Sequence, residues 1–190
     1  MLQLQSRTPR AWLDAVFGDF DAFLVDHTLC ERKASAMGMS LVSKYPDRTL
    51  ILEPLIAFAR EELEHFHIMF KVLAERNLPL PADNKDAYVV GLRKAMLSDP
   101  EGLFLDRLLV CAVVEARSCE RLQLVTEALP ESALKQTYLD LTRAEARHHA
   151  LFFRLAERYF SPERVKQRAR ALFELEAALI ERLPLRPAVH

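Results

Sequence analysis

The sequence predicts an all-α protein, namely a four-helix bundle with additional short helices. The composition favours helix, because only 4 of the 190 residues are glycine while Ala, Leu, Glu and Arg are abundant. Long segments with apolar residues at helical spacing alternate with short proline-containing breaks. No segment shows the alternation of period two that indicates a strand, so essentially no sheet is expected.

The expected helices lie between these breaks. In chain order they cover about residues 11–43, 47–76, 86–97, 98–128, 132–159 and 162–183. Pro54 marks either the start or an early bend of the second helix, because proline fits a first turn but kinks a helix interior. The tail from 184 to 190 is expected to be irregular.

All helices are assigned to one domain over residues 1–190, with a core bundle over about 12–160 and a C-terminal helix over about 162–183. A chain of this length can bury a substantial core, and 51% apolar with 28% charged residues is typical of a globular protein. No apolar run approaches the roughly 20 residues of a membrane span. Three cysteines within helical patterns argue against a disulfide scaffold and suit a reducing cytoplasm.

Six residues form a repeated pattern of metal-binding side chains. Their order is Glu, Glu-x-x-His, Glu, Glu-x-x-His, which hints at a two-fold internal repeat. Residues three apart share a helix face, and each candidate falls in the apolar stripe of its helix, where a charge needs a partner. The predicted metal ligands, which are also the expected catalytic residues, are Glu31, Glu62, His65, Glu115, Glu145 and His148.

Charge explains why such a set needs metal. Four carboxylates in a dry core repel one another and are costly to desolvate, and two divalent cations would neutralise them. Oxygen and imidazole donors without thiolate suit iron or manganese better than a cysteine-based zinc site. This is the ligand set of di-iron and di-manganese bundles of the ferritin-like kind. One Glu-x-x-His motif is common on exposed helices, but two with matching upstream acids predict a dinuclear site.

Other histidines near these motifs are assigned to different roles. Glu64 and His67 also form Glu-x-x-His, but they face about 200° away from the ligand stripe and are expected at the surface. His149 lies off the stripe by the same reasoning. His27 precedes Glu31 by one turn and is interpreted as an ordinary polar residue off its face.

Four charged residues close to the ligands have open assignments. Arg117 and Arg121 flank Glu115 and fit either a hydrogen bond to a metal ligand or an ion pair with another acid. Asp26 and Asp106 lie on ligand-bearing helices and are candidates for orienting His148 or His65.

Several segments resemble the tRNA 2-methylthio-N6-isopentenyladenosine hydroxylase family. The resemblance runs from about Trp12 to Phe160 and is weakest from about Pro162 onward. The segments around two of the lone acids, 30–37 and 115–121, are long enough to be specific, whereas a single Glu-x-x-His motif is not. The resembling segments cover residues 19–24, 26–27, 30–37, 45–48, 61–66, 85–88, 106–109, 115–121 and 145–148.

This resemblance implies a ferritin-like, non-haem di-iron monooxygenase that acts in tRNA modification. Such an enzyme would use dioxygen and two electrons from an external donor to hydroxylate the isopentenyl group of 2-methylthio-N6-isopentenyladenosine next to the anticodon. It implies two iron ions on all six predicted ligands, tRNA as partner, a redox partner protein and a cytoplasmic location. A target base in a folded anticodon loop would have to be unstacked and turned outward.

The residues by themselves leave other functions open. A ferritin- or rubrerythrin-like protein that handles iron or peroxide would use similar ligands, although the chain lacks the Cys-x-x-Cys pairs of a rubredoxin-like site. A manganese catalase shares the ligand set. A purely structural bundle would leave four buried acids unexplained.

The charge balance excludes a strongly basic nucleic-acid binder but is compatible with RNA. The formal net charge is −1 from 26 basic and 27 acidic residues, and about +3 remains when the four ligand acids are set aside. Basic clusters occur at 32–33, 44–48, 93–94 and 164–170, and each taken alone is most simply a solvated face. Arg32 and Lys33 adjoin a predicted ligand and are the first candidates for phosphate contact.

Overall fold

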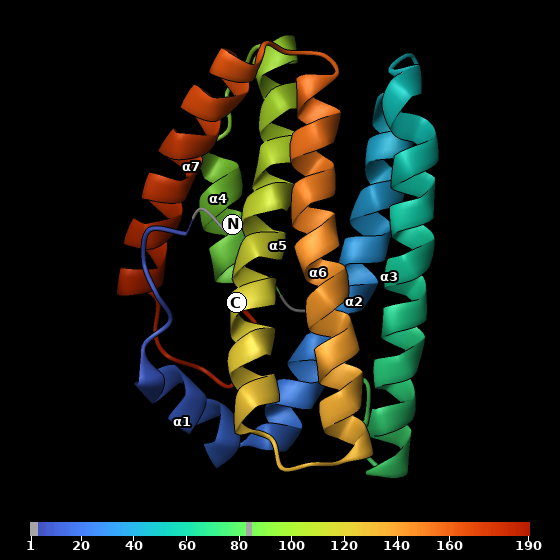
Figure 1. Cartoon of the computed structure of the whole chain (residues 1–190), viewed down its shortest axis with the longest axis vertical. Coiled ribbons are helices and arrows are strands. Elements are labelled where there is room, and N and C mark those ends of the chain that lie inside the picture. The colour runs from blue at the N-terminus through green and yellow to red at the C-terminus, as the bar shows by residue number, and fades with distance from the viewer. Residues whose placement is uncertain (1–3, 83–84) are drawn as a thin grey trace. The chain divides into compact units, whose positions relative to one another are not determined.

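The structure is a computed structural model that describes residues 4–82 and 85–190. Within these ranges it contains helices and no strand, so the predicted all-α class is confirmed. In chain order the described helices are α1 (Arg10–Gly18), α2 (Phe20–Lys44), α3 (Thr49–Glu75), α4 (Ala87–Lys94), α5 (Pro100–Ala128), α6 (Ala133–Glu157) and α7 (Pro162–Arg182), as Figure 1 shows.

The first segment forms two helices, so the prediction of one continuous helix over 11–43 was wrong. Gly18 ends α1, and Asp19 begins α2 as its N-cap, with its carboxylate accepting a hydrogen bond from the Ala22 N–H (3.1 Å). An Asp side chain that binds a free N–H of the first turn favours a new helix start at that position.

The remaining boundaries agree with the prediction within a few residues, and polar caps mark the starts of α4, α5, α6 and α7. Each cap accepts a hydrogen bond from a first-turn N–H and contributes about 1 kcal/mol. The caps of α4, α5, α6 and α7 are Asp86, Asp99, Ser132 and Ser161. Pro54 lies inside α3, five residues after its first residue.

The chain divides into two compact parts. We call residues 14–82 with 186–189 the α2–α3 unit, and residues 4–13, 85–185 and 190 the α4–α7 unit. In the α2–α3 unit the two long helices run side by side (Figure 1), and Ser35 Oγ donates to the Ala59 carbonyl across them (2.8 Å). A Cβ atom on Gly38 would lie 2.9 Å from Phe58 Cδ1, so glycine permits this close approach.

In the α4–α7 unit, α5 contacts α4, α6 and α7 and carries more buried residues than any other described helix. Near its start, the Phe104 ring meets the rings of Tyr159 and Phe160 at 5.4 and 5.8 Å between centroids. An ion pair between Asp106 and Arg168 (2.7 Å) joins α5 to α7. α5, the helix that carries Glu115, is therefore held in place by contacts with α4, α6 and α7.

The C-terminal tail is irregular, as predicted, but part of it is buried. Ala188 and Val189 are core residues. The Val189 N–H donates to Asp26 Oδ2 (2.7 Å) within the α2–α3 unit. Within the α4–α7 unit the His190 ring stacks on Tyr88 at 5.0 Å.

None of the described helices has the length and apolar character that crossing a membrane requires. All three cysteines are free thiols, in agreement with the prediction. Burial raises the pKa of Cys111 to about 12 and that of Cys119 to about 11, so neither is a reactive thiolate at neutral pH.

Candidate metal centre

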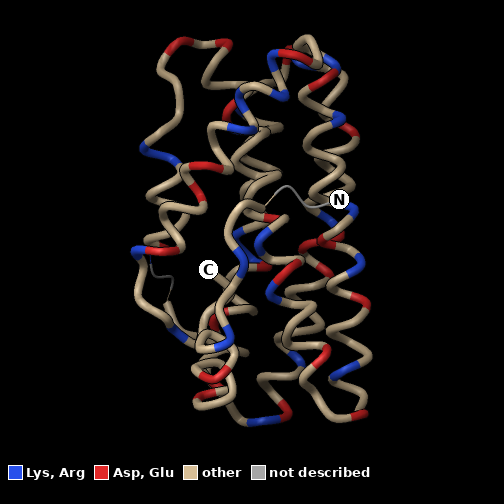
Figure 2. The backbone as a smooth tube through the Cα atoms, turned by 60° about the vertical axis from the view of Figure 1, so that its left-hand side comes forward, with Lys and Arg blue, Asp and Glu red and all other residues tan. Residues whose placement is uncertain are grey.

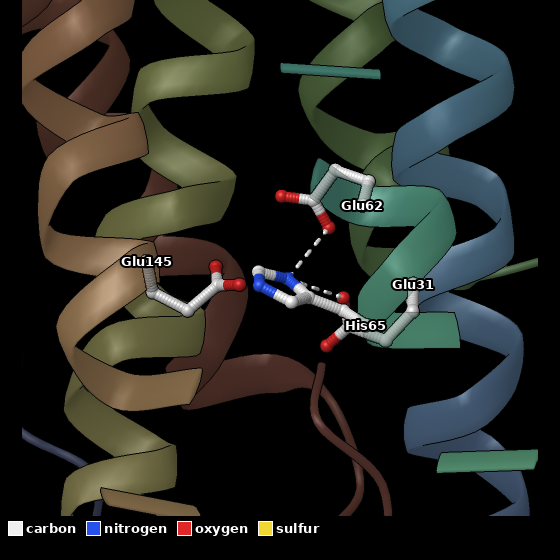
Figure 3. A group of neighbouring side chains, drawn as sticks. All are labelled: Glu31, Glu62, His65 and Glu145. Carbon is white, nitrogen blue, oxygen red and sulfur yellow. Dashed lines mark ion pairs between the residues drawn. The ribbon is translucent and has the colours of Figure 1, made fainter. Parts of the chain in front are cut away.

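Three of the six predicted ligands meet inside the α2–α3 unit. Glu31 of α2 and Glu62 and His65 of α3 each offer a ligand atom within 4.8 Å of the others. Figure 3 shows the two carboxylates directed toward the imidazole, with His65 Nδ1 3.5 Å from Glu31 Oε2 and 3.6 Å from Glu62 Oε2. The exposed fractions are 4% for Glu31, 1% for Glu62 and 7% for His65. The two acids and the histidine therefore form a buried set of O, O and N donors.

Electrostatics within this set are strongly coupled. Burial by itself would raise the pKa of Glu31, but the hydrogen bond from His27 and the nearby His65 outweigh it and hold that pKa well below its ordinary value. Burial would lower the pKa of His65, yet Glu31 and Glu62 raise it to about 10. A cation is thus favoured between the two carboxylates, and in the metal-free chain a proton on His65 supplies that charge.

One carboxylate oxygen of this set is buried without a hydrogen-bond donor among the described residues. Glu31 Oε2 is buried and accepts no hydrogen bond from any residue that the structure describes, while the other oxygen of the same carboxylate is bonded. A buried carboxylate oxygen normally has a hydrogen-bond donor or a metal as its partner. The donor set and this oxygen both fit a divalent cation.

His27 belongs to the site, and its assignment as an ordinary polar residue off the Glu31 face was wrong. It is 1% exposed, and its Nε2 lies 2.6 Å from Glu31 Oε1. Because the Glu31 carboxyl is ionised and can only accept, the Nε2 proton belongs to His27, which donates. Residues four apart share a helix face, and this spacing was the signal that could have identified His27.

The other three predicted ligands lie together inside the α4–α7 unit. Glu115 of α5 and Glu145 and His148 of α6 each have a ligand atom within 4.8 Å of the others. All three are 3% exposed. Each unit therefore contains one lone Glu and one Glu-x-x-His pair, buried together, as the sequence repeat predicts.

The remaining histidines near the motifs have no place in these sets. Glu64 and His67 are exposed, so the prediction that this second motif lies at the surface is confirmed. His149 lies off the ligand stripe as expected but is buried in the core. Its Nδ1 is 2.7 Å from the Ala112 carbonyl oxygen, and burial lowers its pKa.

The two aspartates proposed to orient ligand histidines bind other groups. Asp106 accepts hydrogen bonds from Arg168 and from the Leu97 N–H (2.7 Å). Asp26 accepts from the Val189 N–H and, at 3.8 Å, from the thiol of Cys30. Both acids therefore hold chain segments in place.

Of the two arginines that flank Glu115, Arg117 takes the ion-pair alternative. Arg117 is fully buried and donates two hydrogen bonds to Glu176 of α7. The Arg121 guanidinium lies 4.8 Å from the centre of the Trp12 ring. Burial and the neighbouring Arg117 lower the pKa of Arg121 to about 10.

Comparison with known proteins assigns a family to this pattern. The model of the family described as tRNA-(MS[2]IO[6]A)-hydroxylase (MiaE) matches residues 1–190. A protein of Pseudomonas putida named tRNA 2-(methylsulfanyl)-N(6)-isopentenyladenosine(37) hydroxylase is 35% identical over 80% of this chain and 74% of its own length. A Salmonella typhimurium protein of the same name is 30% identical over 93% of this chain and 83% of its own.

A solved structure supports the same fold. It is described as a protein with aldehyde deformylating oxygenase activity from Synechococcus, and it matches with a TM-score of 0.92 at 30% identity. The match covers 98% of this chain and 93% of the other, which confirms the predicted ferritin-like fold. The family model spans the whole sequence and two relatives share at least 30% identity, so the chain belongs to the tRNA-(MS[2]IO[6]A)-hydroxylase (MiaE) family.

Proposed function

We propose that this chain is a dioxygen-dependent, non-haem di-iron monooxygenase. Its substrate would be tRNA carrying 2-methylthio-N6-isopentenyladenosine next to the anticodon, and its product the hydroxylated isopentenyl group. The names of the two relatives supply the substrate class. The observation that carries the proposal is the pair of buried Glu and Glu-x-x-His sets, one in each unit.

The six ligands are proposed to hold two iron ions together. Four carboxylates and two imidazoles would supply the oxygen and nitrogen donors for two such ions. The carboxylate of Glu31 suits this role. Its Oε1 accepts a hydrogen bond from His27, which leaves Oε2 for a cation. All six side chains are buried, so the charge of two metal ions would offset the four acids where bulk water cannot solvate them.

The chemistry that a reduced iron pair supplies is dioxygen activation with two external electrons, which places one oxygen atom in a C–H bond and the other in water. The residues of this chain hold, orient and shield that centre. A redox partner protein would deliver the electrons. A tRNA substrate would suit a cytoplasmic location, and the match over residues 1–190 supports a single functional domain.

The alternatives are less well supported. A ferritin- or rubrerythrin-like protein and a manganese catalase would use the same donors, but the family model and both named relatives are tRNA hydroxylases. No comparable observation favours iron storage or peroxide removal.

The deciding experiment follows the origin of the new oxygen atom. Iron-loaded, reduced protein is incubated with isopentenylated tRNA under isotope-labelled dioxygen, and the tRNA nucleosides are analysed by mass spectrometry. We expect one labelled oxygen in the isopentenyl group. Unchanged tRNA, with an electron donor present and peroxide or ferrous iron consumed instead, would favour an iron- or peroxide-handling protein. Metal analysis of protein from its own host separates iron from manganese.

His27 offers a test of how Glu31 is positioned. Replacing His27 with leucine removes the donor to Glu31 Oε1, and we expect iron affinity to fall about 10- to 100-fold, as is usual for a group that orients a metal ligand. Replacement by glutamine keeps an N–H donor and should restore part of the affinity. The measurements are iron titration and the Mössbauer spectrum of the loaded protein. His67→Leu, at an exposed position of α3, is the control, and equal affinities for both leucine variants would contradict the role.

A further inference from the structure

Four arginines line one exposed face of α6. Arg143, Arg147, Arg154 and Arg158 are all exposed, the last being the C-cap residue of the helix. At about 100° and 1.5 Å per residue, they fall within an arc of about 60° and extend over about 22 Å. We call these four residues the α6 cationic face.

The same helix carries two predicted metal ligands on a different side. Glu145 lies about 170° and His148 about 110° from the centre of the cationic face, and both are buried. α6 therefore presents one carboxylate and one ligand imidazole to the protein interior and guanidinium groups to solvent. The predicted metal ligands of α6 all lie on its buried side, so the metal site leaves the exposed arginines without an assigned role.

The positive charge continues past the end of α6. Three exposed residues of α7, Arg164, Lys166 and Arg170, follow within one to three turns. The Arg164 guanidinium lies 4.8 Å from the centre of the Phe160 ring, which holds it at the turn between the two helices. Exposed basic residues thus continue in the sequence from α6 into the first turns of α7.

Charge is distributed unevenly between segments. Charged residues occur along all the long helices (Figure 2), but residues 143–170 contain eight basic and three acidic residues, one of which is the buried Glu145. Residues 14–82 contain seven basic and eleven acidic residues. The mildly basic surface expected from the sequence is therefore concentrated on α6 and the start of α7.

The ion pairs that Arg143 and Arg170 form with neighbouring acids are exposed to solvent. Arg143 pairs with Asp140 at 3.2 Å, and Arg170 with Glu174 at 3.0 Å, but all four side chains are more than half exposed. Exposed pairs of this kind contribute about 0–1 kcal/mol and are screened by salt. A polyanion that brings several phosphates can therefore replace them.

The chemistry of the face fits RNA better than a membrane or an apolar protein surface. Among the described residues, the exposed large apolar side chains lie outside α6 and α7. A membrane-binding helix would add bulky apolar residues to its basic side, and here the positions between the arginines include Ala146 and Ala150. Arginine binds phosphate oxygens in a bidentate manner.

We propose that the α6 cationic face, continued by the basic residues of α7, binds the phosphate backbone of tRNA. This inference rests on the proposed function and adds to it the surface that positions the substrate. Phosphate contacts fix register and orientation without reading bases, so the face would hold the stem while the modified base enters the site. Phosphate contact by Arg32 and Lys33, the first candidates from sequence, stays a prediction.

The test compares the full-length protein with three matched variants. In the first, all four arginines of the face become glutamine, and in the second all four become lysine. The control replaces four exposed basic residues of the α2–α3 unit by glutamine, which changes the net charge equally: Lys44, Arg60, Lys71 and Arg76. Binding of labelled isopentenylated tRNA is measured over a salt series, with helix content and iron content recorded for each protein.

The glutamine variant of the face should bind tRNA at least tenfold more weakly at about 0.1 M salt. The slope of log affinity against log salt should fall by about three, from four lost contacts at about 0.7–0.9 each. The lysine variant should retain most of the affinity, and the control should stay within twofold. In turnover, KM for tRNA should rise while kcat and iron content stay constant.

Three results would overturn the proposal in distinguishable ways. If wild-type protein hydroxylates tRNA but the face and control variants lose affinity equally, the surface assignment fails and the proposed function stands. If wild-type protein neither binds nor hydroxylates the tRNA, both fail. A kcat that falls with unchanged KM would assign the arginines to a step other than binding.

Discussion

Replacing Glu62 with alanine is expected to abolish hydroxylation and to reduce bound iron by half or more. Glu62 is 1% exposed and lies with Glu31 and His65 in the buried set of the α2–α3 unit. Loss of a group that only orients a metal ligand costs about 10- to 100-fold in affinity or activity, and loss of a ligand should exceed that. Iron per chain and turnover on isopentenylated tRNA are the measurements.

The chain provides a matched control two residues away. Glu64 is on the same helix and in the same kind of Glu-x-x-His sequence, but it is exposed. Glu64→Ala should keep full iron content and activity. His65→Ala and His67→Ala form a second pair with the same expectation. If the two glutamate variants behave alike, the assignment of ligands by buried face is incorrect.

Replacing Glu176 with alanine should lower the free energy of unfolding by about 3–5 kcal/mol, because it removes the fully buried carboxylate that pairs with the buried Arg117 guanidinium. Arg117 and Glu176 both have fully buried side chains, and Arg117 Nε lies 2.7 Å from Glu176 Oε1. Tyr88 donates to the same carboxylate (3.2 Å), and Arg117 also donates to Glu120 and Thr8. The network connects the N-terminal segment with α4, α5 and α7, and urea unfolding measures its loss.

A second variant separates the charge effect from simple loss of packing. Changing Arg117 to methionine and Glu176 to leucine together removes both charges, and it should cost much less than Glu176→Ala alone. Arg143→Ala, which breaks an exposed pair with Asp140, should change stability by less than about 1 kcal/mol. A double variant as unstable as the single one would mean that packing, and not charge, dominates.

The spacing of apolar residues, prolines and Glu-x-x-His motifs in the sequence was sufficient to predict most of the fold and to predict which ligands lie together. Helical periodicity and proline breaks located the long helices, since the caps at Asp99, Ser132 and Ser161 lie where the sequence signals a start. The Glu-x-x-His repeat selected three residues in each unit that the structure brings together. Joint metal binding by the two sets stays a prediction.

Features that depend on long-range contacts were not predictable. Nothing in the sequence near Arg117 indicates that its partner is Glu176, which is 59 residues away. The break at Asp19 was missed because periodicity continues across it. His27 was missed for a different reason: its four-residue distance from Glu31 was available, but its apolar surroundings become evident only when Phe23 packs against it, 6.0 Å between ring centres.

The two-sided character of α6 limits how this protein can diverge in evolution. Inserting or deleting one residue between Glu145 and Arg158 would rotate everything beyond it by about 100°, and so would separate the buried ligands from the arginines that follow. Within α6 we therefore expect homologous sequences to differ by substitution and to keep a constant length. Length differences should collect in connections such as residues 129–132, which precede the first residue of the helix.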